Sequence, residues 1–271
     1  MLINRHGNPP NFVAILPHYD IILTAPMFHR HKKIFYPPTI LALFAKKLLG
    51  VTTQAIWAVI LSAALLTPSV AAETITLLAN GDVSAWEYQT FDNIVPTHYQ
   101  AAEDKELGQT VLFADSDQGA SGYFRKMPIN LQATPWLHFQ WRIDMAPGGF
   151  DERVKAGDDF AWRLYFTAKE GWVYQSMTLV RSQQRHGEWW RSPYNSLINQ
   201  MWIYTAIGGD APLGEWQTTS INLAVLWRDL FDAQAPPLDL VGFMSDGDSA
   251  GVQMRSRYGD MVLSTSPTPP F

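Results

Sequence analysis

Cysteine is absent from all 271 residues of the sequence. This absence excludes disulfide bonds, thiolate metal sites, a cysteine nucleophile and the lipid-modified cysteine of bacterial lipoproteins. A chain without disulfides must be stabilised by its hydrophobic core, and about 200 residues are enough to form one.

Histidine is scarce after residue 72, where only His98, His138 and His186 occur. They lie far apart and do not have the spacing of zinc ligands. No His-Glu-x-x-His motif, phosphate-binding loop or dinucleotide fingerprint is present. A glycosidase needs two carboxylates beside the sugar, and nothing in the sequence selects such a pair. We therefore predict no catalytic residue.

Basic residues are outnumbered once the N-terminal segment is set aside. The sequence has 20 Lys/Arg and 25 Asp/Glu, of which residues 1–72 hold six and one. The rest of the chain has 14 basic and 24 acidic residues, a net charge of −10. An acidic domain of this kind is a poor match for nucleic acid or anionic lipid, so we expect neither as a partner.

Long hydrophobic runs are limited to one segment, Ala55–Leu66, which has the length of a signal-peptide core. Lys46 and Lys47 precede it, and small residues up to Ala72 suit a signal peptidase. We predict an N-terminal extension and signal peptide over 1–72, cleaved near Ala72, and a periplasmic or secreted protein that meets the membrane only during export. The alternative is an uncleaved anchor over 48–66.

Helical periodicity is also rare, since only residues 224–231 have helical spacing. Short alternating segments, of which 137–145 is the clearest, predict about nine or ten strands separated by turns. The segment 157–166 is expected to be a central strand, with Phe160, Trp162, Leu164 and Phe166 on its core face. We predict one antiparallel β-sandwich domain over 73–271, with one short helix and a loose Pro-rich C-terminal tail.

Several motifs occur in a fixed order over roughly 86–265. They are Trp141-Arg142, Gly157-Asp158-Asp159-Phe160-Ala161-Trp162-Arg163, Trp190 with Ser192-Pro193, Gly214-Glu215-Trp216, Met244-Ser245-Asp246-Gly247-Asp248-Ser249-Ala250-Gly251, and Tyr258-Gly259-Asp260. Together they resemble an exported bacterial family described only as a domain of unknown function. The resemblance implies a jelly-roll sandwich, distantly similar to galactose-binding-like and carbohydrate-binding modules. It implies no activity.

Acidic residues gather near the two longest of these motifs. The candidate ligands of a structural calcium ion assembled from separate loops are Asp158, Asp159, Asp246, Asp248 and Asp260. The pattern after Asp246 is not an EF-hand, because Arg257 stands where a bidentate glutamate is needed. The competing interpretations are a polar β-turn and a buried Asp159–Arg163 pair that fixes strand register.

Tryptophan is abundant, with ten of eleven in the part of the chain after residue 72. Flat aromatic rings suit the apolar C–H faces of sugars, although many tryptophans in such a domain are packing residues. The predicted ligand-binding residues are Asp159, Arg163, Trp172, Tyr174, Trp189, Trp190 and Trp202.

The sequence therefore favours a periplasmic protein that binds a carbohydrate or another envelope component without chemistry. Calcium is the one cofactor considered. A carbohydrate-active hydrolase or lyase that uses two of the acids is the second hypothesis. A structural or assembly factor of the cell envelope is the third.

Overall fold

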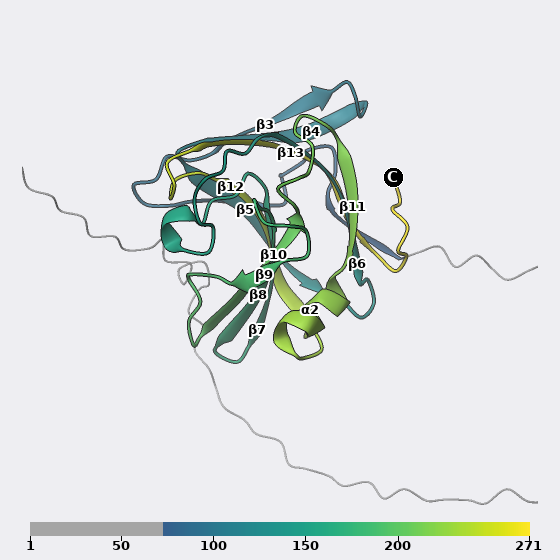
Figure 1. Cartoon of the computed structure of the whole chain (residues 1–271). Helices are drawn as coiled ribbons and strands as arrows, with labels where there is room; N and C mark the ends of the chain where they lie inside the picture. Colours follow the sequence, from purple (N-terminus) through teal and green to yellow (C-terminus); the bar gives the residue numbers. More distant parts are fainter. Residues whose placement is uncertain (1–72) are drawn as a thin grey trace, which may run out of the picture. The chain divides into compact units, whose positions relative to one another are not determined.

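Thirteen strands in two sheets form most of residues 73–271, the part of the chain that the computed structural model describes (Figure 1). The predicted signal peptide and the alternative anchor lie outside these residues. Within 73–271, no helix is long and apolar enough to cross a membrane.

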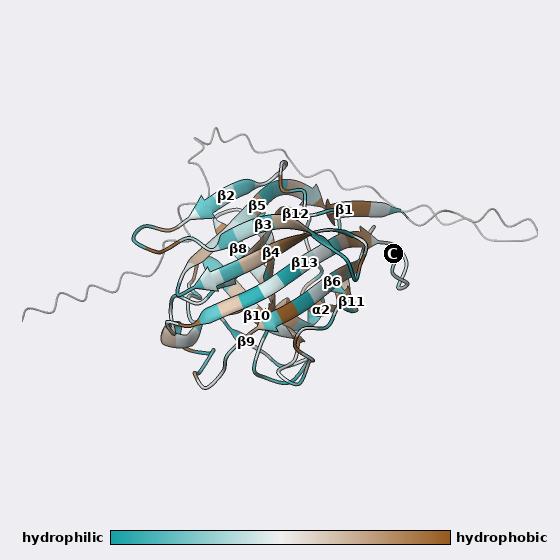
Figure 2. Cartoon of the chain, turned by 90° about the horizontal axis from the view of Figure 1, so that it is seen from above, coloured by the Kyte–Doolittle hydropathy of each residue, from teal (hydrophilic) through white to brown (hydrophobic). Residues whose placement is uncertain are grey.

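The six-stranded sheet has the order β11-β6-β13-β4-β3, and β1 pairs with β13. Its strands are β1 (Thr74–Leu78), β3 (His98–Asp104), β4 (Gln109–Asp117), β6 (Trp136–Met145), β11 (Gln217–Asn222) and β13 (Gln253–Ser264). All of its pairings are antiparallel. Hydrophobic and hydrophilic residues alternate along β6 and β13, as a sheet with one buried face requires (Figure 2).

The seven-stranded sheet has the order β2-β5-β12-β7-β8-β10-β9. Its strands are β2 (Glu87–Thr90), β5 (Ala120–Ile129), β7 (Arg163–Glu170), β8 (Val173–Arg181), β9 (Trp189–Arg191), β10 (Asn199–Ile207) and β12 (Leu238–Asp246). The predicted antiparallel β-sandwich is confirmed, with one exception. β8 and β10 run parallel, because the chain first forms the edge strand β9 and then returns between β9 and β8.

Two helices complete the described residues. The short 3-10 helix η2 (Lys155–Gly157) precedes β7, and α2 (Leu223–Phe231) follows β11. The side chain of Asn222 caps α2 by accepting a hydrogen bond from Val225 N, and Asp232 ends the helix in a left-handed conformation. The one helix predicted from the sequence is therefore present, beginning one residue earlier.

The core lies between the sheets. Trp162 stacks on Phe139, with ring centroids 4.7 Å apart, and Leu164 and Phe166 join the same apolar cluster. The prediction that Phe160 shares this face is wrong. The strand begins only at Arg163, so the alternation of a strand does not apply to Phe160, which packs in a separate cluster with Val180, Trp190 and Ile203.

Candidate functional site

Arg163, the first residue of β7, holds two carboxylates inside the domain. Its Nη1 donates to Asp158 Oδ2 at 3.1 Å, and its Nη2 pairs with Asp246 Oδ2 at 3.0 Å. Its guanidinium carbon lies 4.3 Å from the centroid of the Phe160 ring. The pair predicted between Asp159 and Arg163 is replaced by these two, because both carboxylate oxygens of Asp159 bind backbone N–H groups of the turn after β12.

Asp159 binds the turn between β12 and β13. Its Oδ1 accepts a hydrogen bond from Ser249 N at 3.1 Å, and its Oδ2 accepts one from Ala250 N at 2.5 Å. Asp246 meets Phe160 through two bonds, accepting from Phe160 N at 3.2 Å and donating from its own N to Phe160 O at 3.1 Å. The segment before β7 is thus tied to the end of β12 and to the turn after it.

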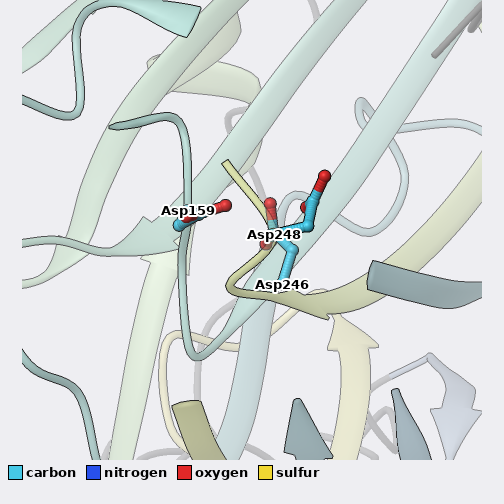
Figure 3. Close-up of side chains that lie close together, drawn as sticks. All are labelled: Asp159, Asp246 and Asp248. Atoms are coloured by element: carbon cyan, nitrogen blue, oxygen red, sulfur yellow. The ribbon is translucent and has the colours of Figure 1, made fainter. Parts of the chain in front are cut away.

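One carboxylate oxygen from each of Asp159, Asp246 and Asp248 lies within 4.8 Å of the others (Figure 3). Asp159 and Asp246 are buried, and Asp248 is half-buried. Asp158 directly precedes Asp159 in the sequence, and its Oδ1 is buried without a hydrogen-bond partner among residues 73–271. The site is a cluster of oxygen ligands contributed by two separate segments.

The cluster has more acid than base. Burial raises the pKa of Asp158, Asp159 and Asp248 above the usual value of 3.8, and it raises that of Asp246 well above it. Arg163 opposes the rise by favouring the ionised carboxylates, but one guanidinium cannot balance four of them. Such a cluster either binds protons or binds a cation, and a hard divalent cation prefers carboxylate oxygens.

The predicted metal ligands do not all meet. Asp246 and Asp248 belong to the trio, and Asp159, predicted both as a calcium ligand and as a sugar ligand, completes it. Asp158 binds Arg163 instead. Asp260 lies on β13 in the other sheet, where its Oδ1 accepts a hydrogen bond from Asn80 N at 3.0 Å. Chain order alone could not separate these roles.

The turn itself spells Gly247-Asp248-Ser249-Ala250-Gly251, which matches the Gly-x-Ser-x-Gly pattern of serine hydrolases. The structural context of that pattern is a strand, a sharp turn and a helix. Here the turn joins β12 to β13, and the backbone N–H of Ser249 binds Asp159. The sequence pattern is therefore present without its structural context, and Ser249 does not have the position of a nucleophile.

A second cluster lies at the β9 edge of the seven-stranded sheet. Trp189 and Trp202 pack edge to face, with ring centroids 5.0 Å apart and planes at 74°. Arg191 also lies over the ring of Trp202, its guanidinium carbon 4.4 Å from the ring centroid. Trp189 is 48% exposed. We call these three residues, with Tyr204, the aromatic platform.

The strand register explains why these side chains share a face. Trp202 pairs with Arg191, and Tyr204 pairs with Trp189, so all four point to the same side of β9 and β10. Trp202 and Tyr204 pack partly against the core, which fixes their rings. Gln200 continues this face along β10, and its Oε1 accepts a hydrogen bond from Gln175 Nε2 at 3.3 Å.

The remaining aromatic residues predicted to bind ligand lie elsewhere. Trp190 points to the opposite face from Trp189 and is buried against Phe160. Trp172 is in the turn between β7 and β8 and is 74% exposed. Tyr174 lies under Lys169, whose Nζ is 5.2 Å from its ring centroid. Of the seven predicted residues, the structure brings Trp189 and Trp202 together on the platform, and Asp159 and Arg163 in the acidic cluster.

Comparison with known proteins gives a family for this chain. Residues 84–262 match the family described as "Protein of unknown function (DUF3047)". The chain belongs to this family. The resemblance inferred from the ordered motifs is thereby confirmed at the level of the family. No curated protein matches the chain.

Distant similarities to solved structures accompany the family match. A mutant of the carbohydrate-binding module CBM29-2, complexed with mannohexaose, has 11% identity and a TM-score of 0.35 over 73% of this chain and 94% of that one. The family 30 carbohydrate-binding module of a Clostridium thermocellum cellulosomal cellulase has 13% identity and a TM-score of 0.40 over 72% and 99%. The xyloglucanase domain of NopAA from Sinorhizobium fredii has 8% identity and a TM-score of 0.38 over 72% of this chain and 98% of that one. The ligands named with these structures are ligands of those proteins and are not assigned to this chain.

Two members of the platform were not predicted as site residues, namely Arg191 and Tyr204. Their signal in the sequence was period two, since Arg191 is two residues after Trp189 and Tyr204 is two after Trp202. β9 has only three residues, too few for alternation to stand out.

Proposed function

We propose that this protein is an exported binding protein that holds a carbohydrate on the aromatic platform and carries out no chemistry. The observation that supports it is the contact between Trp189, exposed on the edge strand β9, and Trp202, half-buried on the neighbouring strand β10. Rigid indole rings offer a large apolar surface at a low cost in conformational entropy, and the C–H faces of sugars match such a surface.

The contrast between two adjacent residues supports a role for the platform in binding. Trp190 faces Phe160 and is buried, as a packing residue should be. Trp189, on the other face, leaves half of its surface in water next to Trp202. Gln200 and Gln175 lie along the same face and supply amide groups that can bond sugar hydroxyls.

Export is proposed from the sequence. The apolar run Ala55–Leu66 and the small residues up to Ala72 fit a cleaved signal peptide. The lack of cysteine and the acidic balance of residues 73–271 are compatible with an envelope or extracellular location.

We also propose that Asp159, Asp246 and Asp248 bind a calcium ion that braces the turn after β12. The ion would neutralise carboxylates that burial otherwise forces toward the protonated form. It would also act on the sheet beside the platform, since Asp246 binds the backbone of Phe160, and Phe160 packs on Trp190 of β9. The ring centroids of Phe160 and Trp190 are 6.4 Å apart.

A hydrolase or lyase would need two carboxylates with their oxygens available to the ligand. Near the platform, Glu188 is ion-paired with both Arg153 and Arg185. In the acidic cluster, Asp158 and Asp246 are bound by Arg163, and Asp159 by backbone N–H groups. No contact of these acids favours catalysis over binding, so we propose binding alone.

The test is isothermal titration calorimetry with a panel of soluble polysaccharides, on the wild type and on Trp189→Ala and Trp202→Ala. We expect binding of at least one glycan, weakened about tenfold or more by either substitution through loss of ring contact. Arg228→Gln, an exposed change on α2, is the control and should bind like the wild type. Binding of no glycan, or binding by both tryptophan variants as tight as that of the wild type, contradicts the proposal.

A further inference from the structure

We propose that the carbohydrate held on the platform is acidic, and that Arg191 recognises its carboxylate. The inference rests on the proposed function and adds the chemical class of the ligand. A polyuronate is the substance that best fits it.

Arg191 is an exposed arginine without a counter-charge. Its guanidinium lies over the ring of Trp202, and no acidic group of residues 73–271 forms an ion pair with it. Residues 73–271 carry ten more acidic than basic residues, yet none of these acids is ion-paired with Arg191. An anion from outside the protein is the natural partner of this side chain.

The other solvent-accessible arginines of the domain mostly behave differently. Each of six arginines forms an ion pair with an aspartate or glutamate, namely Arg142, Arg153, Arg185, Arg228, Arg255 and Arg257. Arg191 differs from these six. Arg125, half-buried on β5, also forms no ion pair within residues 73–271, but it does not lie on the platform.

Two acidic groups near the platform lie at the end of β9 away from Arg191. Glu188 precedes Trp189 and is ion-paired with Arg153 and Arg185, at 3.0 and 3.5 Å. Asp210 lies beyond the end of β10, close to His186 and Gly208. Arg191, at the other end of β9, is therefore the cation that an anion on the platform would meet.

The distance between Trp189 and Arg191 fits a single sugar ring that carries one carboxylate. Trp189 and Arg191 are two residues apart on the same strand face, which separates their Cα atoms by about 6.6 Å. A sugar ring stacked on Trp189 would place a carboxylate on the ring edge within reach of the Arg191 guanidinium. The planar fork of arginine matches a carboxylate with two parallel hydrogen bonds, and Trp202 beneath it holds the fork in place.

The test is calorimetry on the full chain with polygalacturonate, with the same polymer after chemical reduction of its carboxyl groups, and with dextran sulfate. We expect the polyuronate to bind about tenfold or more tightly than its reduced form, the size of effect a charge-assisted hydrogen bond gives. Raising NaCl from about 0.02 M to about 0.3 M should reduce this difference in affinity, since salt screens an exposed ion pair between Arg191 and a carboxylate.

Variants separate the two proposals. Arg191→Gln should remove the preference, so that the polyuronate and its reduced form bind about equally, whereas Trp189→Ala should weaken binding of both and keep the preference. Arg228→Gln is the matched arginine control and should keep the preference. Circular dichroism of each variant checks that it is folded.

Three results would overturn the inference. Equal affinity for the polyuronate and its reduced form would refute the acidic ligand and leave the proposed function standing. An Arg191-dependent affinity for dextran sulfate without affinity for polygalacturonate would replace the carboxylate by a sulfate. Binding of no polysaccharide, neutral or acidic, would overturn the proposed function as well.

Discussion

The Nη2 of Arg163 lies 3.0 Å from the Oδ2 of Asp246, and both side chains are only 3% exposed. The pair joins the first residue of β7 to the last residue of β12, two strands that are neighbours in the seven-stranded sheet. A second carboxylate, that of Asp158, binds the same guanidinium. A charge buried in this way depends on its partners, because water cannot replace them.

Removing the guanidinium should therefore be costly. Arg163→Ala leaves Asp158 and Asp246 buried without their counter-charge, and we expect the free energy of unfolding to fall by about 3–5 kcal/mol. Urea denaturation followed by tryptophan fluorescence measures it. Arg228→Ala removes an exposed arginine from α2 and should change the same quantity by less than about 0.5 kcal/mol. Equal losses of unfolding free energy in the two variants would show that the buried ion pairs contribute no more to stability than an exposed arginine does.

Calcium should stabilise the wild type against heat, with an effect of about 2.7 kcal/mol at a hundredfold excess over the dissociation constant. Asp248→Asn keeps the size of the side chain and removes one ligand charge, so we expect most of the calcium-dependent rise in Tm to disappear. Differential scanning calorimetry with EDTA or with added calcium measures it. Asp229→Asn on α2 should respond to calcium like the wild type. An unchanged Tm of the wild type on adding calcium after EDTA treatment rules out the ion.

Glu152 should contribute to the pH dependence of stability. It is buried, accepts hydrogen bonds from Ser182 Oγ and from Gln183 N, and burial raises its pKa above the usual 4.5. A raised carboxyl pKa means that the folded state binds the proton more tightly than the unfolded state. The stability that Glu152 contributes is therefore fully present below pH 4.5 and is lost as pH rises through its folded-state pKa.

The substitution Glu152→Gln makes this residue insensitive to pH. We expect the Tm of the variant to fall less than that of the wild type between about pH 4.5 and pH 7, when both are measured by scanning calorimetry. The difference between the two proteins isolates Glu152 from other titrating groups. Parallel curves for the variant and the wild type would show that Glu152 has the same pKa in both states.

Trp172 provides a test of where the ligand binds. Its indole is more exposed than that of Trp189, but it lies in the β7–β8 turn and outside the aromatic platform. We expect Trp172→Ala to bind glycans as the wild type does in the calorimetric assay that detects Trp189→Ala. A loss of affinity as large as that of Trp189→Ala would move the binding surface toward the β7–β8 turn.

Several features of the fold followed from local pattern. Alternation along β6 and turn residues between short apolar segments predicted the sandwich, and helical spacing at residues 224–231 predicted α2. The short strand β9 could not be found this way, because three residues hold too little periodicity. The parallel placement of β10 beside β8 was also missed, since it depends on strand pairing over distance.

The same distinction between local pattern and strand pairing applies to the candidate sites. The sequence by itself determined that acids surround residues 158 and 246, that cysteine chemistry is absent and that tryptophan is plentiful. Only the tertiary structure decided that Asp159 joins Asp246 and Asp248 while Asp260 lies in the other sheet. It also decided that Trp189 meets Trp202 while Trp190 is buried. The physical reason is that composition and spacing fix which groups a chain carries, whereas strand register and sheet order fix which of them share a face.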